Sequence, residues 1–163
     1  MTSVKPTRRP FRLELLLIVF ALVAGLTACA GQAAGEPVPP EIHLGEDACQ
    51  FCRMIISDER YAAGYLTPNG EEFIFDDIGD MFKHHAEQST AVTAFFVHDH
   101  NEHTWIRAET AVYVLNLELP TPMLSGLAAF ADDGQAGRFA AVSGSEILTF
   151  EVLQERYRET AKE

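Results

Sequence analysis

The hydrophobic and polar positions in the first half of the folded region predict two short strands, a helix and a third strand. Residues 61–66 and 72–75 have the composition of strands, and the turn between them contains Gly70, which adopts a positive φ easily. Met81, Phe82 and His85 follow Ile78 at three, four and seven positions, which is the spacing of an amphipathic helix, and this helix is expected to end before Ser89. Residues 91–97 are nearly all apolar, as in a strand buried on both faces. The first half therefore has the predicted order ββαβ.

A similar order of segments follows in the second half. Residues 111–115 and 127–130 are apolar, which predicts two further strands. Asp132 or Asp133 is placed to cap a helix that runs to about Val142. The remaining predicted elements are a strand over residues 147–150 and a charged C-terminal helix over residues 151–158.

The two halves have the features of an internal duplication. Phe75-Asp76-Asp77 and Phe130-Ala131-Asp132 lie 55 residues apart, each just before a predicted helix. We therefore expect two ββαβ units, over about residues 54–100 and 108–151. Short helices would pack against mixed sheets, so the predicted fold class is α+β.

The first 28 residues predict a signal peptide followed by a lipid anchor. Basic residues precede a short apolar run over residues 15–24, which is shorter than the roughly 20 residues needed to cross a bilayer. Leu26-Thr27-Ala28-Cys29 has the form of a lipobox, which predicts cleavage before Cys29 and a lipid on its sulfur. An ordinary signal peptide cut near Ala28 and an uncleaved anchor are the alternatives. Residues 29–47 then form a flexible tether to a domain over residues 48–163.

Charge limits the partners of the exported domain. Removal of residues 1–28 takes away four basic residues and one acidic residue, and the formal net charge changes from −12 to −15. Such a domain is repelled by nucleic acid and by anionic lipid headgroups. We therefore expect no binding to nucleic acid, and attachment to the membrane through acyl chains alone.

The stretch from Cys49 to Met54 holds two thiols and one thioether in six residues. Thiolate and thioether sulfur are soft ligands that suit Cu(I), and thiolates also suit zinc. On an extended backbone, Cys52 and Met54 would point to the same side, and Cys49 would approach through a turn. A disulfide or redox pair and plain hydrophobic packing are the alternatives. Because Ile55-Ile56 favours a strand, the redox reading is weakened, since such pairs normally open a helix.

Two further side chains are candidate ligands. Met123 lies in Pro120-Thr121-Pro122-Met123, where no hydrophobic period explains an apolar residue. His98 ends the third predicted strand, close to His100 and His103, and histidine is a common metal ligand. The chain contains no glycine-rich phosphate loop, no Gly-x-Ser-x-Gly elbow and no His-Glu-x-x-His motif. We therefore expect a binding protein and not an enzyme.

The order of the motifs resembles that of the nitrous oxide reductase accessory proteins, the NosL family. The resemblance covers about residues 26–151. It rests on the lipobox, the Cys-x-x-Cys-x-Met stretch, the Phe-Asp-Asp that precedes a helix, Val97-His98-Asp99 at a strand end, and Pro122-Met123 before an apolar strand. The family implies a duplicated ββαβ fold similar to that of the organomercurial lyases. It also implies a copper chaperone in which Cys52 and Met54 match the copper-binding Cys-x-Met and Met123 matches a further methionine.

The resemblance further implies partners and a location. The partners are nitrous oxide reductase and its ABC-type membrane complex for maturation, in denitrification. The location is the outer, periplasmic or extracellular, face of the cell membrane. Two positions depart from the family pattern, because Arg53 and Leu124 stand where glycine is common. Glycine allows backbone angles that other residues avoid.

The sequence therefore predicts a membrane-anchored Cu(I) chaperone for the copper centres of nitrous oxide reductase. A thiol–disulfide oxidoreductase that uses Cys49 and Cys52 is one alternative. A zinc-binding structural lipoprotein is another. An enzyme that cleaves carbon–metal bonds would need an acid beside paired thiols, and no residue is assigned to that role.

Overall fold

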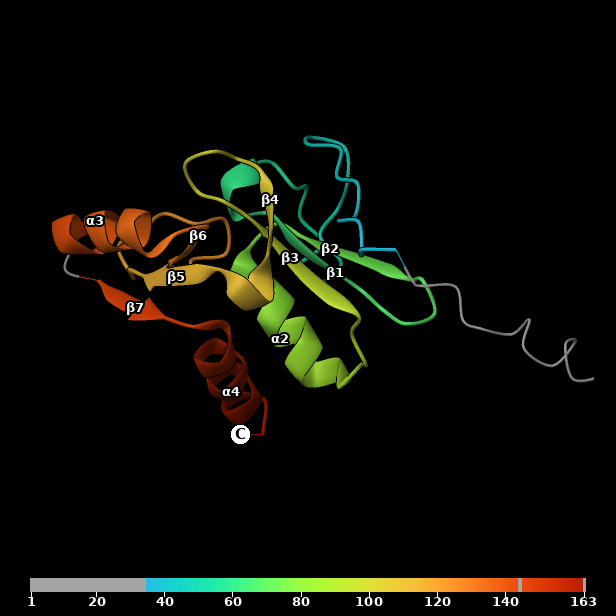
Figure 1. Cartoon of the computed structure of the whole chain (residues 1–163). Coiled ribbons are helices and arrows are strands. Elements are labelled where there is room, and N and C mark those ends of the chain that lie inside the picture. The colour runs from blue at the N-terminus through green and yellow to red at the C-terminus, as the bar shows by residue number, and fades with distance from the viewer. Residues whose placement is uncertain (1–34, 144, 163) are drawn as a thin grey trace, which may run out of the picture. The chain divides into compact units, whose positions relative to one another are not determined.

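A four-stranded antiparallel sheet forms the first half of the folded unit, which extends from Pro37 to Glu163 in the computed structural model (Figure 1). The strands lie in the order β2-β1-β3-β4. Their bounds are Ala63–Leu66 for β1, Glu72–Phe75 for β2, Ala94–His98 for β3 and Trp105–Arg107 for β4. The structure describes residues 35–143 and 145–162, so the predicted signal peptide and Cys29 lie outside the described residues.

The helix α2, Ile78–Gln88, has the bounds that its apolar spacing predicted. Asp77 caps its N-terminus by accepting a hydrogen bond from Gly79 N–H. Its apolar residues Ile78, Met81 and Phe82 are buried in the core. The first turn of this helix also carries Asp80, a fully buried acidic residue.

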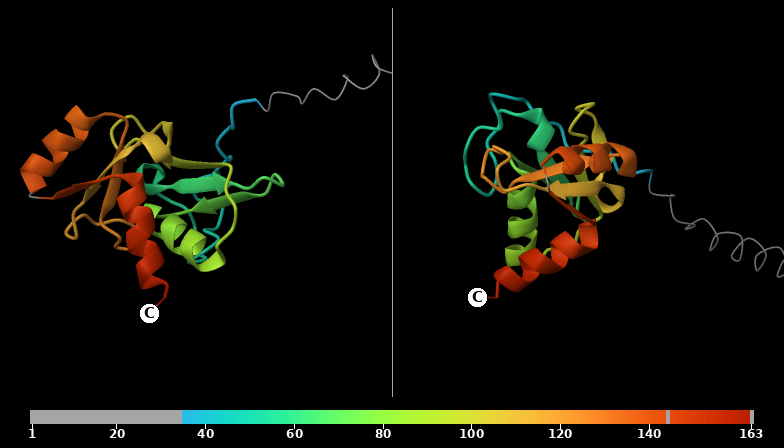
Figure 2. Two further views of the ribbon diagram at one scale, coloured as in Figure 1. Left: turned by 60° about the horizontal axis from the view of Figure 1, so that its bottom comes forward. Right: turned by 90° about the vertical axis from the view of Figure 1, so that its left-hand side faces the viewer.

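The second half forms a three-stranded sheet in the order β6-β5-β7. The strands are β5, Val112–Leu115; β6, Leu127–Phe130; and β7, Glu146–Leu148. The helix α3, Asp133–Ser143, packs on this sheet. A last helix, α4, covers Phe150–Thr160 and lies against α2. Figure 2 shows α2 and α4 side by side, with α3 away from them on the second sheet.

The α+β fold class and the order of two ββαβ units are confirmed, with one difference in pairing. Every strand pair in both sheets is antiparallel among the described residues, so the sheets are not mixed. The reason is that β1 lies between β2 and β3, and β5 lies between β6 and β7. Strands that run in the same direction are therefore separated by a central strand and do not pair.

Several boundaries and short elements differ from the sequence predictions, and β3 starts at Ala94 and not at residue 91. The last strand ends at Leu148, because Thr149 accepts a hydrogen bond from Val152 N–H and starts α4. Tyr61 belongs to a short 3-10 helix, η1 (Glu59–Tyr61), and not to β1. The strand β4 was not predicted, and neither was a second 3-10 helix, η2 (Ala108–Thr110). Elements of three residues are too short to show a hydrophobic period.

One hydrophobic core joins the two halves. The buried Tyr65 and Phe75 of the first sheet, Tyr113 and Leu127 of the second, and Leu153 of α4 belong to the same cluster. Cys49 and Ile56 also belong to it, and Phe51 and Cys52 pack against it. The stretch that carries the two thiols is therefore anchored in the core at one edge of the first sheet.

Candidate metal centre

The stretch from Cys49 to Met54 folds into a tight turn closed by backbone hydrogen bonds. Cys49 N–H donates to Met54 C=O at 2.8 Å, and Arg53 N–H donates to Cys49 C=O at 3.0 Å. An isolated antiparallel bridge between Ala48 and Ile55 flanks the turn. Arg53 has a φ of 68°, in the left-handed region. The extended backbone predicted for Cys52 to Met54 is therefore wrong, whereas the turn predicted for Cys49 is present. We refer to residues 49–54 as the cysteine turn.

The cysteine turn brings both thiols together with a carboxyl group of α2. Cys52 N–H donates to Cys49 Sγ at 3.3 Å, and Cys49 Sγ–H donates to Asp80 Oδ2 at 3.6 Å. One ligand atom from each of the three residues lies within 4.8 Å of the other two. Cys49 is fully buried, Cys52 is half-buried, and both are free thiols. This spacing is compatible with one metal ion bound between them.

Burial raises the pKa of two groups at this site. It raises the pKa of Cys52 from 9.0 to about 12, and hydrogen bonds to Cys49 and Asp80 add to this effect. Burial also raises the pKa of the Asp80 carboxyl, although its hydrogen bond with Cys52 acts in the opposite direction. Asp80 Oδ1 accepts no hydrogen bond from the described residues, and Lys83 Nζ lies 3.7 Å away from it. A cation that replaces the thiol proton would therefore find a buried oxygen with spare acceptor capacity.

The two methionines that the sequence singled out lie in different surroundings. Met54 is 56% exposed and ends the cysteine turn, so solvent and other molecules reach its side chain. Met123 is half-buried, and its backbone N–H donates to Asp77 Oδ2 at 3.0 Å. Leu124, which follows it, has a φ of 57°. Both positions where the family commonly has glycine, Arg53 and Leu124, thus adopt left-handed backbone.

His98 has partners of its own outside the thiol group. Its Nδ1 is paired with Ala62 C=O at 3.0 Å, and its Nε2 lies 3.9 Å from Glu59 Oε1. The imidazole is buried against the ring of Trp105. Within the described part of the chain, the thiols and Asp80 form the one group of histidine, cysteine and acidic ligands with metal-binding spacing. The role of His98 as a ligand stays a prediction.

Asp80 is the residue of this group that sequence reasoning did not assign. An acidic residue in the first turn of a helix is commonplace, because it interacts favourably with the helix dipole. The signal that distinguishes Asp80 is its position between Ile78 and Met81, on the buried side of an amphipathic helix. A carboxyl group at such a position needs a partner in the core.

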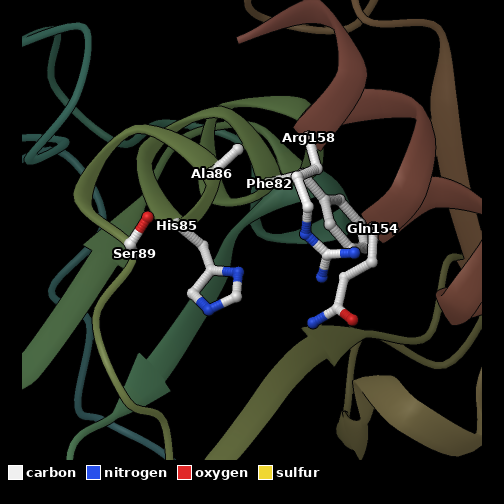
Figure 3. A pocket seen from close by; sticks show the side chains of 6 residues that line it. All are labelled: Phe82, His85, Ala86, Ser89, Gln154 and Arg158. Atoms are coloured by element: carbon white, nitrogen blue, oxygen red, sulfur yellow. The ribbon is translucent and has the colours of Figure 1, made fainter. Parts of the chain in front are cut away.

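A separate pocket of about 240 Å³ lies between α2 and α4. Figure 3 shows the side chains of His85, Gln154 and Arg158 around this space, with the ring of Phe82 behind Arg158. None of the predicted sulfur ligands lines it. The pocket and the thiol group are therefore distinct features of the molecule.

Fold and site together define a small α+β domain with two free thiols and a carboxyl group arranged as a metal centre. The family model of NosL matches residues 41–157, and the chain belongs to the NosL family. The copper-binding lipoprotein NosL of Stutzerimonas stutzeri is 25% identical over 150 residues, which cover 85% of this chain and 79% of that protein. The crystal structure of the copper chaperone NosL from Shewanella denitrificans matches with a TM-score of 0.62.

The structural match covers 71% of this chain and 96% of that one, at 18% sequence identity. It confirms the predicted fold, and the family model confirms the resemblance noted from the motifs. Within residues 35–143 and 145–162, no helix is long and apolar enough to span a membrane.

Proposed function

We propose that this protein is a lipid-anchored, extracytoplasmic Cu(I) chaperone that supplies copper for the copper centres of nitrous oxide reductase. The observation that carries the proposal is the cysteine turn, in which two free thiols lie beside each other and next to an exposed methionine. The names of the relatives, a copper-binding lipoprotein and a copper chaperone, support it.

The ligand types favour monovalent copper. In the proposed centre, Cys52 binds as a thiolate and Met54 as a neutral thioether, both of which are soft donors that suit Cu(I). Cys49 and Met123 are the further sulfur donors, and His98 is a more distant candidate. Because the Cys52 thiol is protonated in the metal-free protein, binding releases a proton and its strength increases with pH.

Delivery, and not catalysis, is the activity that we assign. Met54 is exposed, so a sulfur or imidazole ligand of an acceptor can approach the ion before the thiolate leaves. Copper then passes by exchange of ligands. The predicted lipid on Cys29 and a tether that ends where the folded unit starts, at Pro37 and not at residue 47, hold the acidic domain near membrane partners, namely the ABC-type complex that serves nitrous oxide reductase.

Competition for Cu(I) against a chromophoric chelator, in reducing buffer, tests the ligand assignment. We expect Cys52→Ser to abolish retention of Cu(I), because it removes the thiolate of the proposed Cys-x-Met pair. Met54→Ala should weaken retention by about tenfold, the low end of what the loss of a metal-site interaction costs. Met81→Leu is the matched control for Met54→Ala, since it removes a buried thioether of α2 that is not assigned to the centre. Full Cu(I) affinity in Cys52→Ser would refute the proposal.

Zinc binding is a second candidate, because Cys49, Cys52 and Asp80 also form a ligand set that Zn(II) accepts. Titration with Zn(II) under the same conditions separates the two, since zinc depends on Asp80 and not on Met54. The oxidoreductase alternative is disfavoured by the raised pKa of Cys52, because a reactive thiol needs a lowered pKa.

A further inference from the structure

Asp77 uses its two carboxyl oxygens to hold two different segments. Oδ1 accepts a hydrogen bond from Gly79 N–H at 2.7 Å and so caps α2. Oδ2 accepts a hydrogen bond from Met123 N–H at 3.0 Å, across 46 residues of sequence. The side chain is fully buried, so water cannot replace either partner. Helix capping therefore explains the hydrogen bond to Oδ1 and not the hydrogen bond to Oδ2.

The same helical turn holds the cysteine turn. Asp80 lies three residues after Asp77, one helical turn further along, and accepts the hydrogen bond from Cys49 Sγ–H. Three residues of α-helix correspond to a rise of about 4.5 Å. The backbone of Met123 and the thiol of Cys49 are therefore attached to neighbouring points on one rigid element.

The loop that carries Met123 packs directly against this turn. A Cβ atom added at Gly79 would lie 2.5 Å from Ser125 Cβ, so only glycine allows so close an approach. The loop also contains the left-handed Leu124, a backbone conformation that residues other than glycine rarely adopt. A strained loop of this kind needs fixed anchors, and the hydrogen bond to Asp77 is one of them.

We propose that Asp77 is a positioning residue that holds Met123 beside the cysteine turn, so that its thioether completes the copper centre. This inference rests on the proposed function. Asp77 does not contact the ion, and it acts through the backbone of Met123. In this arrangement, Met123 of the second half supplies a sulfur ligand to the centre, and α2 of the first half holds it in place.

The duplication of the fold supplies a matched control. Asp132 lies 55 residues after Asp77 and starts α3 in the second half. It accepts hydrogen bonds from Gln135 N–H at 2.9 Å and Gln135 Nε2–H at 2.7 Å, and it is exposed. Asp132 therefore has the capping role of Asp77 without a hydrogen bond to a methionine of the described residues.

Asp77→Asn is the decisive substitution. Asparagine is a good N-cap, so its oxygen can serve Gly79, but its amino group then faces Met123 N–H and two donors oppose each other. We expect the affinity for Cu(I) to fall by about tenfold or more, as when an outer-shell partner of a metal ligand is lost. Asp132→Asn should change it by no more than about twofold, as expected for an exposed position.

A double substitution separates positioning from general loss of stability. In Met123→Ala, the further change Asp77→Asn should leave the Cu(I) affinity nearly unchanged, because the residue through which Asp77 acts is gone. X-ray absorption of the copper-loaded protein should show one sulfur neighbour fewer in Asp77→Asn than in the wild type. An equal loss of affinity with and without Met123 would overturn the proposal, as would an unchanged affinity.

Two measurements keep the test valid if Asp77→Asn is unstable. Asp77→Ser retains a capping oxygen but is too short to reach Met123, so it should reproduce the loss of affinity. In metal-free protein, hydrogen exchange of the Met123 amide should accelerate in both Asp77 variants and not in Asp132→Asn. If wild-type protein bound no Cu(I), the proposed function would fail together with this role. If the wild type bound Cu(I) and the Asp77 variants bound it with the same affinity, only the role of Asp77 would be refuted.

Discussion

At the scale of single residues, Arg53 and Leu124 show how a departure from a family pattern has a conformational cost. Both adopt left-handed backbone, with φ of 68° and 57°, where the family commonly has glycine. Leu124 is 78% exposed, so burial of its side chain does not offset the unfavourable backbone conformation. The local geometry of both loops is therefore maintained by hydrogen bonds and neighbouring contacts.

The cost at Arg53 leads to a prediction about stability. Arg53→Gly should raise the free energy of unfolding by up to about 1 kcal/mol, because glycine adopts this φ without a steric penalty. Chemical denaturation of the metal-free, reduced protein measures it. Arg53→Ala is the control, since it removes the guanidinium and keeps the Cβ atom. Equal stabilisation by alanine would show that charge, and not backbone conformation, is responsible.

The buried thiol of Cys52 leads to a prediction about pH. Burial raises its pKa to about 12, so copper must displace a proton at every pH below that value. We expect the affinity for Cu(I) to rise by about tenfold per pH unit for this thiol, without a plateau near the ordinary thiol pKa of about 8.5. Chelator competition at several pH values measures the slope, corrected for the chelator.

Met54→Ala is the control for this slope, because a thioether does not titrate. It should lower the affinity at each pH and leave the slope unchanged. The stability of the metal-free protein should change with pH in the direction opposite to the affinity for Cu(I). Its stability should fall as the pH rises from about 9 towards 12, because the unfolded thiol ionises first. A plateau in affinity near pH 9 would show that the folded thiol has an ordinary pKa.

At the scale of elements, the long periodic segments were predictable and the short ones were not. The helix α2 and the strands β2 and β6 have the predicted bounds, because their spacing and their capping residues agree. The strand β4 has only three residues, and the start of α4 at Phe150 depends on a threonine cap. Neither leaves a periodic pattern in the sequence.

The thiols of the candidate site could be singled out from the sequence, but their geometry could not. The spacing of Cys49 and Cys52 pointed to paired sulfur atoms, and the ligand role of Met54 stays a prediction. A left-handed residue at position 53 turns the backbone away from the extended form. The contact between Cys49 and Asp80 joins residues 31 positions apart. Only the packing of α2 against the cysteine turn creates it, and no local pattern encodes such packing.

The close approach at Gly79 leads to a prediction about α2. Gly79→Ala should destabilise the protein by about 1–3 kcal/mol, since its Cβ atom would overlap Ser125 and the Tyr157 hydroxyl. Gly137→Ala in α3 is the matched control, because nothing lies within 4 Å of its added Cβ atom. That change should be neutral or stabilising by up to about 1 kcal/mol. Thermal unfolding of both variants measures the contrast, and equal effects would contradict the packing.

At the scale of the whole molecule, the duplicated halves do not have equal roles. One core joins both sheets and α4, and the second half adds a smaller hydrophobic cluster between β5, β6 and α3. The first half contributes the cysteine turn and α2, and the second contributes the loop with Met123. The proposed centre therefore draws on both repeats and needs the complete domain.

The contrast in exposure between Cys49 and Met54 has a consequence for the direction of transfer. An approaching acceptor reaches the thioether first, because one thiol is fully buried and the methionine is 56% exposed. The first bond to break would then be to a neutral atom, and no proton has to return at that moment. Binding of the ion would therefore depend on pH, whereas the first step of its release would not.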